Sequence, residues 1–232
     1  GLARSGADVV IWGRNADKNE KAKEALSRSG TRVFAQRVDV ADESTVVSAF
    51  AEALAAMGRI DFVAANAGVG WTCPFNELTS EAWRQIMTVN LDAVFWTFRE
   101  ACRHMVQRAK DGDPGGSLLV SSSIAALNNP SKSQAYASSK AAVIALVRSI
   151  AAEHARYGVR ANAVLPGFVR SDLSAHLQTD EKFNESVIQG RVPMRRWGEP
   201  DDFAGLAVYL ASNLSSFHTA DTFVVDGCYT NS

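Results

Sequence analysis

The chain has 232 residues, 47% of them hydrophobic and 21% charged, which is enough for one sizeable core in an α/β domain. Its 24 Lys and Arg residues balance 25 Asp and Glu residues, so no basic face is expected for nucleic acid or an anionic membrane surface. No apolar run approaches the roughly 20 residues that cross a bilayer, so no membrane partner is expected.

The first half of the chain predicts alternating strands and helices. Apolar runs indicate strands at residues 8–12, 32–40 and 61–65. The two helices between these strands each lie between a candidate N-cap and a terminating glycine, Asn15 to Gly30 and Asp42 to Gly58. A long helix is expected from residue 80 to about residue 107, followed by a charged loop rich in Gly and Pro.

The second half continues this alternation. Strands are expected at residues 118–122, 159–165 and 222–225, and helices at residues 136–157 and 200–212. A variable stretch with short helices covers residues 171–198. Alternation of this kind predicts an α/β fold with a parallel sheet and helices on both faces. No repeat or linker interrupts the chain, so residues 1–232 are expected to form a single domain.

Tyr136 and Lys140 are four residues apart, so they share one face of the helix that they open. A nearby ammonium favours the phenolate and lowers the pKa of a tyrosine, whose ordinary pKa near 10 makes it a poor acid–base catalyst at neutral pH. Such a pair alone is more often a plain surface pair. Ser121, Ser122 and Ser123 close the preceding strand, where alternation places Ser121 and Ser123 on one face.

Three further motifs give this pair a context. Asn66-Ala67-Gly68 and Pro166-Gly167 each follow a predicted strand, and Asn90 lies within the long helix. With Ser123 thirteen residues before Tyr136, this order resembles the short-chain dehydrogenase/reductase family over essentially the whole chain. The resemblance implies a Rossmann-like doubly wound parallel sheet. It also implies an NAD(P)(H)-dependent oxidoreductase that transfers a hydride between the nicotinamide and a carbonyl or secondary alcohol.

The resemblance assigns a role to each of four catalytic residues. Tyr136 is the expected general acid in reduction and the base in oxidation. Lys140 lowers the pKa of Tyr136 and binds the nicotinamide ribose, while Ser123 donates a hydrogen bond to the substrate oxygen. Asn90 is expected to hold a water that links Lys140 to solvent. The spacing to Tyr136 selects Ser123 from the three consecutive serines.

The first predicted strand ends where the cofactor's adenosine ribose is expected. Gly13 stands where NAD-binding folds often place an acidic residue, and Arg14 follows it. A guanidinium there pairs with a 2′-phosphate, which favours NADP(H), with NAD(H) as the alternative. Arg14 is otherwise a solvated residue at a helix start. Asp39, beside Val40, is expected either to accept from the adenine amine or to help cap the next helix.

The remaining cofactor contacts also come from the resemblance. The backbone of Val169 is expected to bind the nicotinamide carboxamide, and Ser171 replaces a more usual threonine. Small residues let the backbone approach adenosine closely. The other expected contacts, besides Tyr136 and Lys140, are Asn66, Ala67, Gly68, Pro166 and Gly167.

The sequence leaves the substrate open. The expected substrate-binding residues are Ser123, Tyr136, Trp71, Asn128 and Phe168. Asn128 favours an oxygenated substrate, whereas Trp71 and Phe168 favour an apolar ketone. In either case the expected partner is a small carbonyl or alcohol.

Residues 141–152 are apolar nearly all round, which predicts a helix buried on both sides. One stripe can face the sheet, and the small residues Ala141, Ala145 and Ala152 can face another subunit. Because family members of this type are commonly tetramers, with dimers next, a homotetramer or homodimer is expected.

The family's Gly-rich phosphate-binding turn has no counterpart in this sequence. Residues 1–7 resemble the end of the family's first helix, so a strand, the turn and a helix start are expected upstream of Gly1. A vacant strand position is then expected in the sheet. Two alternative functions stay open: a non-catalytic dinucleotide-binding regulatory protein, and an inactive fragment of a reductase. The complete catalytic set argues against the first, because a binder does not need all four residues.

Cysteine and histidine usage predicts neither disulfides nor a metal site. Cys73, Cys102 and Cys228 are scattered, which is typical of free thiols in a reducing compartment, so a cytoplasmic location is expected. The four histidines are isolated and lack the spacing of metal ligands.

Overall fold

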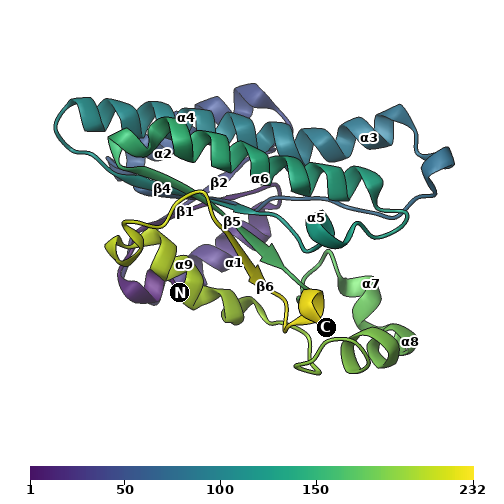
Figure 1. The fold of residues 1–232 in the computed structure, drawn as a ribbon. Helices are drawn as coiled ribbons and strands as arrows, with labels where there is room; N and C mark the ends of the chain where they lie inside the picture. The colour runs from purple at the N-terminus through teal and green to yellow at the C-terminus, as the bar shows by residue number, and fades with distance from the viewer.

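The computed structural model describes all 232 residues and shows parallel β-sheet covered by helices on both faces (Figure 1). The six strands are β1 (Val9–Gly13), β2 (Val33–Arg37), β3 (Phe62–Ala65), β4 (Gly116–Ser121), β5 (Val159–Pro166) and β6 (Thr222–Val225). Every strand pair is parallel, as the alternation of strands and helices predicts. The Rossmann-like doubly wound fold is therefore confirmed.

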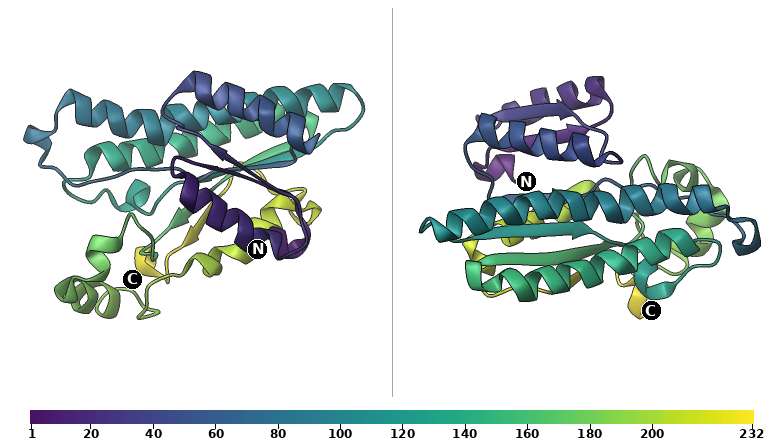
Figure 2. Two further views of the ribbon diagram at one scale, coloured as in Figure 1. Left: turned by 180° about the vertical axis from the view of Figure 1, so that it is seen from behind. Right: turned by 90° about the horizontal axis from the view of Figure 1, so that it is seen from above.

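The strands form two sheets, β1-β2 and β3-β4-β5-β6, with no pairing between β1 and β3. Figure 2 shows the β1-β2 unit beside the larger sheet. The chain runs outward from this junction in both directions, so the strand order reverses there, and ligands of such sheets bind at the carboxyl ends of the strands around that point. A continuous sheet would have refuted the expected vacant strand position, and the sheet is not continuous.

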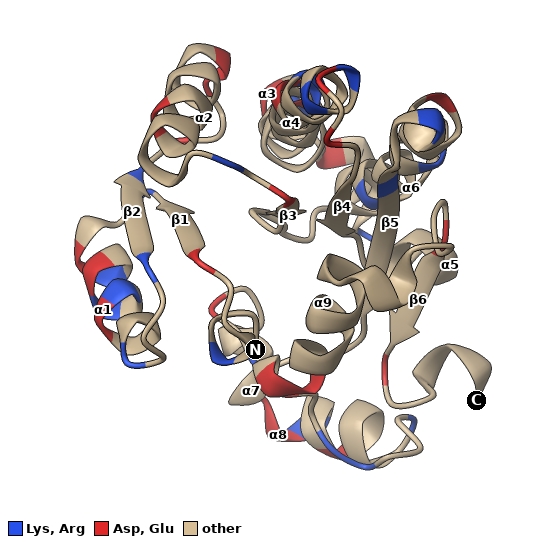
Figure 3. Ribbon diagram, turned by 90° about the vertical axis from the view of Figure 1, so that its left-hand side faces the viewer, with Lys and Arg blue, Asp and Glu red and all other residues tan.

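Helices cover the two faces in different numbers. The helices are α1 (Ala16–Ser27), α2 (Glu43–Met57), α3 (Ser80–Met87), α4 (Ala93–Lys110), α5 (Ala125–Asn128), α6 (Gln134–His154), α7 (Ala175–Gln178), α8 (Glu181–Phe183) and α9 (Ala204–Ala211). Helices α2, α3, α4 and α6 lie on one face, and α1 and α9 lie on the other (Figures 1 and 3). Acidic and basic residues are interspersed over α1, α3, α4 and α6, whereas α2 carries only acidic residues and α9 carries no charged residue (Figure 3).

Two predicted helices differ from the structure. The long helix expected from residue 80 is interrupted by a π-helical turn, Thr88–Asp92, between α3 and α4. The helix expected from residue 200 begins as a 3₁₀ turn, Pro200–Phe203, before α9. Such turns keep the chain helical, so a pattern of apolar residues does not reveal them.

The predicted helix starts are confirmed. The side chain of Asn15 accepts a hydrogen bond from the Lys18 N–H at 2.9 Å, and Asp42 accepts one from the Thr45 N–H at 2.7 Å. Gly58 ends α2 at φ 77°, a left-handed conformation that glycine adopts without strain. Local sequence therefore fixes where α1 and α2 begin and where α2 ends.

The core lies on both sides of β4, whose side chains alternate between two apolar clusters. Leu118 and Val120 pack in the larger cluster with Phe98 of α4, and Leu119 packs in a smaller one with Leu210 of α9. Phe50 of α2 joins the larger cluster, so it packs the β1-β2 unit against the rest of the molecule.

Residues 134–157 form one helix that is long and apolar enough to cross a membrane by length and composition alone. Val143, Val147 and Ala151 of this segment lie in the larger apolar cluster against the sheet. The segment is therefore a core helix of the domain.

Candidate active site

Three consecutive serines at the end of β4 take three different partners. The Ser121 hydroxyl donates to Oδ1 of Asn66 at 2.7 Å, and the Ser122 hydroxyl donates to the carbonyl of Lys140 at 2.6 Å. The Ser123 side chain accepts from the Ala125 N–H at 3.1 Å, and it lies near enough to the Tyr136 phenol to act on the pKa of that group. Ser123 is therefore the serine that the fold brings to Tyr136, and the other two fix the surrounding segments.

Lys140 is buried, with 4% of its surface exposed, although it carries an ammonium group. Its Nζ donates to the carbonyl of Ser121 at 2.7 Å and lies 5.7 Å from the centroid of the Tyr136 ring. Burial lowers the pKa of Lys140 to about 8. The ammonium therefore keeps its proton near neutral pH, close to the phenol and to the carboxyl end of β4.

Tyr136 differs from the sequence-based expectation in its acid strength. Burial raises the pKa of the Tyr136 phenol above its ordinary value, and the hydrogen bond with Ser123 acts in the opposite direction. No lowering by Lys140 outweighs this loss of solvation. Tyr136 therefore carries its proton at neutral pH, which is the form that a general acid needs.

Asn90 is completely buried within the π-helical turn. Its Oδ1 accepts from the Val69 N–H at 2.9 Å, and its Nδ2 donates to the Val69 carbonyl at 2.9 Å and to Ser139 Oγ at 3.0 Å. The Ser139 hydroxyl in turn donates to the Tyr136 carbonyl at 2.7 Å. The side-chain amide thus links the loop after β3 to the helix of Tyr136. The water-holding role expected for Asn90 stays a prediction.

The residues expected to contact adenosine lie where β3 ends. Asn66, Ala67 and Gly68 are all exposed. A Cβ on Gly68 would lie 3.3 Å from the Lys140 Nζ and 3.4 Å from Asn90 Oδ1, so a larger residue would crowd this buried pair. Glycine at this position therefore leaves room for the Lys140 ammonium and the Asn90 amide.

A second group of expected residues lies where β1 and β2 end. Arg14, Arg37 and Asp39 line an open basin of about 370 Å³, and the Arg37 Nε donates to the Arg14 carbonyl at 3.3 Å. Two guanidinium groups at one basin suit an anionic ligand such as a phosphate. Arg37 was not singled out in the sequence, because strand pairing with β1 brings it to Arg14.

The structure shows how Asp39 lies relative to the start of α2. Asp42 itself caps α2, while the Asp39 carboxylate accepts from the Ala41 N–H at 3.1 Å and the Asp39 carbonyl accepts from the Asp42 N–H at 3.3 Å. Asp39 thus supports the turn that leads into the cap and is not the N-cap itself. Its exposed carboxylate remains in the Arg14 basin, beside Val40, and the adenine contact stays a prediction.

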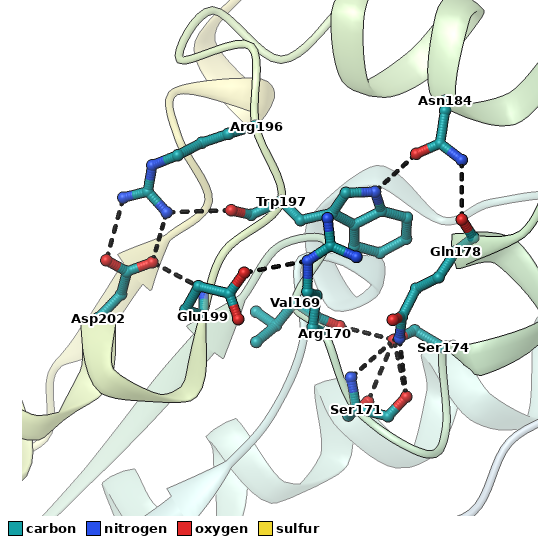
Figure 4. A network of polar contacts seen from close by, with 10 residues as sticks. All are labelled: Val169, Arg170, Ser171, Ser174, Gln178, Asn184, Arg196, Trp197, Glu199 and Asp202. Atoms are coloured by element: carbon teal, nitrogen blue, oxygen red, sulfur yellow. Dashed lines mark hydrogen bonds and ion pairs between the residues drawn. The ribbon is translucent and has the colours of Figure 1, made fainter. Parts of the chain in front are cut away.

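The loop after β5 is held firmly at the same edge of the sheet (Figure 4). The Ser174 hydroxyl donates to the Val169 carbonyl at 2.7 Å and accepts from the Ser171 N–H at 3.1 Å. Arg170 pairs with Glu199 at 3.0 Å. No group of the chain accepts from the Val169 N–H, so this donor is free for the carboxamide contact expected of Val169.

The turn that opens this loop also needs its glycine. A Cβ on Gly167 would lie 2.7 Å from the Asp226 Cα, so only glycine lets the turn after Pro166 approach the end of β6. This close backbone contact fixes where the loop begins, at the carboxyl end of β5 beside the end of β6.

These observations fit a nicotinamide dinucleotide. Arg14 and Arg37 offer cations at one end of the edge, and the free Val169 N–H lies in the loop at the other. Small exposed residues after β3 lie between them. Tyr136 and Lys140 open α6 above the same edge. The chain therefore presents donors at both ends of an elongated anionic ligand.

The residues expected to bind the substrate differ in their exposure to solvent. Trp71 is 37% exposed, and Asn128 lies exposed at the end of α5. Phe168 instead packs against three aromatic rings, Phe183, Tyr229 and Trp197, with ring centroids 5.3, 5.0 and 6.3 Å away. Phe168 thus helps to shape the loop after β5, and its direct contact with a substrate stays a prediction.

Comparison with known proteins decides the family. A family model described as Enoyl-(Acyl carrier protein) reductase matches residues 1–230. The chain is 32% identical over 227 residues to gluconate 5-dehydrogenase of Gluconobacter oxydans (strain 621H), covering 98% of this chain and 86% of the relative. The chain belongs to the short-chain dehydrogenase/reductase family.

Other members of the short-chain dehydrogenase/reductase family agree. The NADP-dependent (R)-specific alcohol dehydrogenase of Lentilactobacillus kefiri is 37% identical over 231 residues, which cover 99% of this chain and 89% of the relative. The crystal structure of a gluconate 5-dehydrogenase from Burkholderia cenocepacia J2315, in complex with NADP and tartrate, has a TM-score of 0.92 and 32% identity. That match covers 100% of this chain and 88% of the other. This short-chain dehydrogenase/reductase is therefore an NAD(P)(H)-dependent oxidoreductase.

Proposed function

We propose that this short-chain dehydrogenase/reductase prefers NADP(H) and interconverts a carbonyl and a secondary alcohol, with Tyr136 as the proton donor and acceptor. The observation that carries the proposal is the convergence of Ser123, Tyr136 and Lys140 at the carboxyl edge of β4. The segment that follows β4 supplies Ser123, and α6 supplies both Tyr136 and Lys140. The two segments are joined by hydrogen bonds from the Ser122 hydroxyl to the Lys140 carbonyl and from the Lys140 Nζ to the Ser121 carbonyl.

The chain's own residues act on the substrate oxygen. A bound nicotinamide supplies or takes the hydride. The hydroxyls of Ser123 and Tyr136 both donate to the oxygen, which stabilises the negative charge that develops there during reduction. Tyr136 then passes its proton to that oxygen, and it takes the proton back in oxidation. The Lys140 ammonium stabilises the phenolate that remains.

The basin at Arg14 supports the NADP(H) preference. Arg14 and Arg37 provide two guanidinium groups for a 2′-phosphate, whereas Gly13 offers no carboxylate for a ribose hydroxyl. Two relatives support the same preference: the Lentilactobacillus enzyme is named NADP-dependent, and the Burkholderia structure contains NADP. We expect NAD(H) to bind more weakly than NADP(H).

We also propose a cytoplasmic homotetramer or homodimer. Ala141, Ala145 and Ala152 are exposed on the outer face of α6, where small residues permit close helix packing. Light scattering at micromolar concentration tests this, and a monomer would contradict it.

A two-cofactor activity screen tests the proposed function. Purified protein is assayed for consumption of NADPH or NADH with ketones, sugar acids and keto sugars, and for the reverse reaction with the matching alcohols. Turnover with NADPH exceeding that with NADH is expected for at least one carbonyl class. Cofactor binding without turnover of any carbonyl would favour a non-catalytic binder instead.

A further inference from the structure

Gly70 lies against the ring of Tyr136, in the loop that follows β3. A Cβ built on Gly70 would lie 2.7 Å from Cδ2, 3.1 Å from Cε2 and 3.3 Å from Cγ of that ring. The first of these distances is too short for any real side chain. The backbone at Gly70 therefore packs directly against one side of the Tyr136 ring, with no room for a side chain between them.

Glycine is needed at position 70 because a side chain would clash with the Tyr136 ring, and not because of the backbone conformation there. The φ of Gly70 lies outside the left-handed region, so other residues could adopt its backbone geometry. The atoms that a methyl group would meet belong to a ring and not to a flexible side-chain end. Either the ring or the loop must move to admit it.

The loop is poorly able to move away. Both polar groups of the Val69 backbone are hydrogen-bonded to the buried side chain of Asn90. Beyond Gly70, the Cys73 N–H donates to the Lys132 carbonyl at 2.8 Å. The loop segment is therefore fixed on both sides of Gly70.

The backbone of the tyrosine's helix is fixed by the same asparagine. Asn90 Nδ2 donates to Ser139 Oγ, and the Ser139 hydroxyl donates to the Tyr136 carbonyl. One buried side chain thus sets the separation between the Gly70 backbone and the first turn of α6. Since hydrogen bonds restrain both backbones, we expect added bulk at residue 70 to displace the ring.

We propose that Gly70 is a positioning residue for Tyr136, holding the ring so that its hydroxyl reaches both Ser123 and the substrate oxygen. The inference rests on the proposed role of Tyr136 as the proton donor. The added Cβ also approaches Cγ, which lies on the axis of the ring, so the whole ring has to shift about χ1. Such a shift separates the phenol from Ser123, and an error of about 1 Å in such a group can lower a rate about 100-fold.

The kinetic test compares Gly70→Ala with Gly205→Ala. Gly205 lies in α9 with nothing within 4 Å of an added Cβ, so its substitution controls for the change itself. For Gly70→Ala we expect kcat to fall by about 100-fold, the pH profile of kcat to shift, and the Kd for NADPH to stay within about twofold of wild type. Gly205→Ala should match wild type in all three.

A double-mutant cycle with Tyr136→Ala tests the contact without relying on activity. If the ring is what the methyl group meets, Gly70→Ala lowers the midpoint of urea unfolding in the wild type and leaves it nearly unchanged in Tyr136→Ala. Should Gly70→Ala alone fail to fold, the double variant should fold, because the ring is gone.

Two results would overturn the proposal. One is a Gly70→Ala enzyme with wild-type kcat and pH profile. The other is an equal loss of stability in the presence and absence of the Tyr136 ring. A wild-type protein that reduces no carbonyl would instead count against the proposed function, while the unfolding cycle would still report the contact.

Discussion

Replacing Lys140 by Met should stabilise the folded protein while removing its activity. Burial lowers the pKa of Lys140 from its ordinary value of 10.5 to about 8. At about 1.4 kcal/mol per pH unit, this shift means that the charged amine costs the fold about 3 kcal/mol at neutral pH. Methionine fills a similar volume, but the Ser121 carbonyl then loses the hydrogen bond from Nζ. This loss reduces the expected stabilisation by about 1 kcal/mol. The expected net gain at pH 7 is about 2 kcal/mol.

The gain should depend on pH with a definite sign. Below pH 8 the lysine is protonated in both the folded and unfolded chains, and the full cost is present. Between pH 8 and 10.5 the unfolded chain holds a proton that the folded chain has lost, so wild-type stability rises with pH relative to Lys140→Met. The advantage of the variant should therefore shrink from pH 8 upward.

Urea unfolding of both proteins at equal protomer concentration, from pH 7 to pH 10, measures this difference. Titrating groups that the two proteins share cancel in the comparison. Lys21→Met, at an exposed position of α1, is the matched control and should show a small difference that does not change with pH. A Lys140→Met advantage that is constant with pH, or a variant less stable than wild type at pH 7, would contradict the desolvation argument.

Three further substitutions probe the cofactor basin, the backbone and the core. Arg14→Ala should weaken NADPH binding about 10- to 100-fold, leave NADH binding nearly unchanged, and so lower the affinity ratio measured by fluorescence titration. Cys228→Gly should stabilise the fold by about 1 kcal/mol, because exposed Cys228 is held at φ 74°, whereas Ala145→Gly within α6 should destabilise it by a similar amount; thermal unfolding of both decides. Phe98→Ala should cost about 3–5 kcal/mol in the completely buried core, whereas Phe75→Ala, 70% exposed, should cost under about 0.5 kcal/mol in urea unfolding.

Local patterns in the sequence predict much of the fold. Asn15 and Asp42 cap their helices because a side-chain oxygen three residues before a free backbone N–H is a local arrangement. Runs of apolar residues locate all six strands to within a few residues, since buried parallel strands need such runs. The spacing of Tyr136 and Lys140 likewise fixes their shared helix face.

Features that depend on distant parts of the chain were not predictable in this way. Asn90 lies in the π-helical turn, and its side chain hydrogen-bonds Val69 and Ser139. Neither partner is near Asn90 in the sequence. Arg37 becomes a site residue only because β2 pairs with β1 beside Arg14. The need for glycine at position 70 likewise appears only once the Tyr136 ring is in place.

The electrostatics of the catalytic pair show the same limit. Proximity in the helix predicts that Lys140 lowers the pKa of Tyr136. The folded chain buries both groups, and burial acts on both pKa values in the direction that favours the neutral form. How far each side chain is removed from water is a property of the packed structure, so spacing alone does not give the net direction of the Tyr136 pKa.

The central claim is that Tyr136 transfers the proton in a carbonyl reduction. The most direct measurement compares single-turnover rates of the wild type and Tyr136→Phe at saturating NADPH, with the best substrate from the carbonyl screen. Phenylalanine keeps the ring against Gly70 and removes only the hydroxyl, so folding and NADPH affinity should persist while the rate falls by about 100-fold or more. A variant that binds NADPH normally and keeps most of the wild-type rate would contradict the claim.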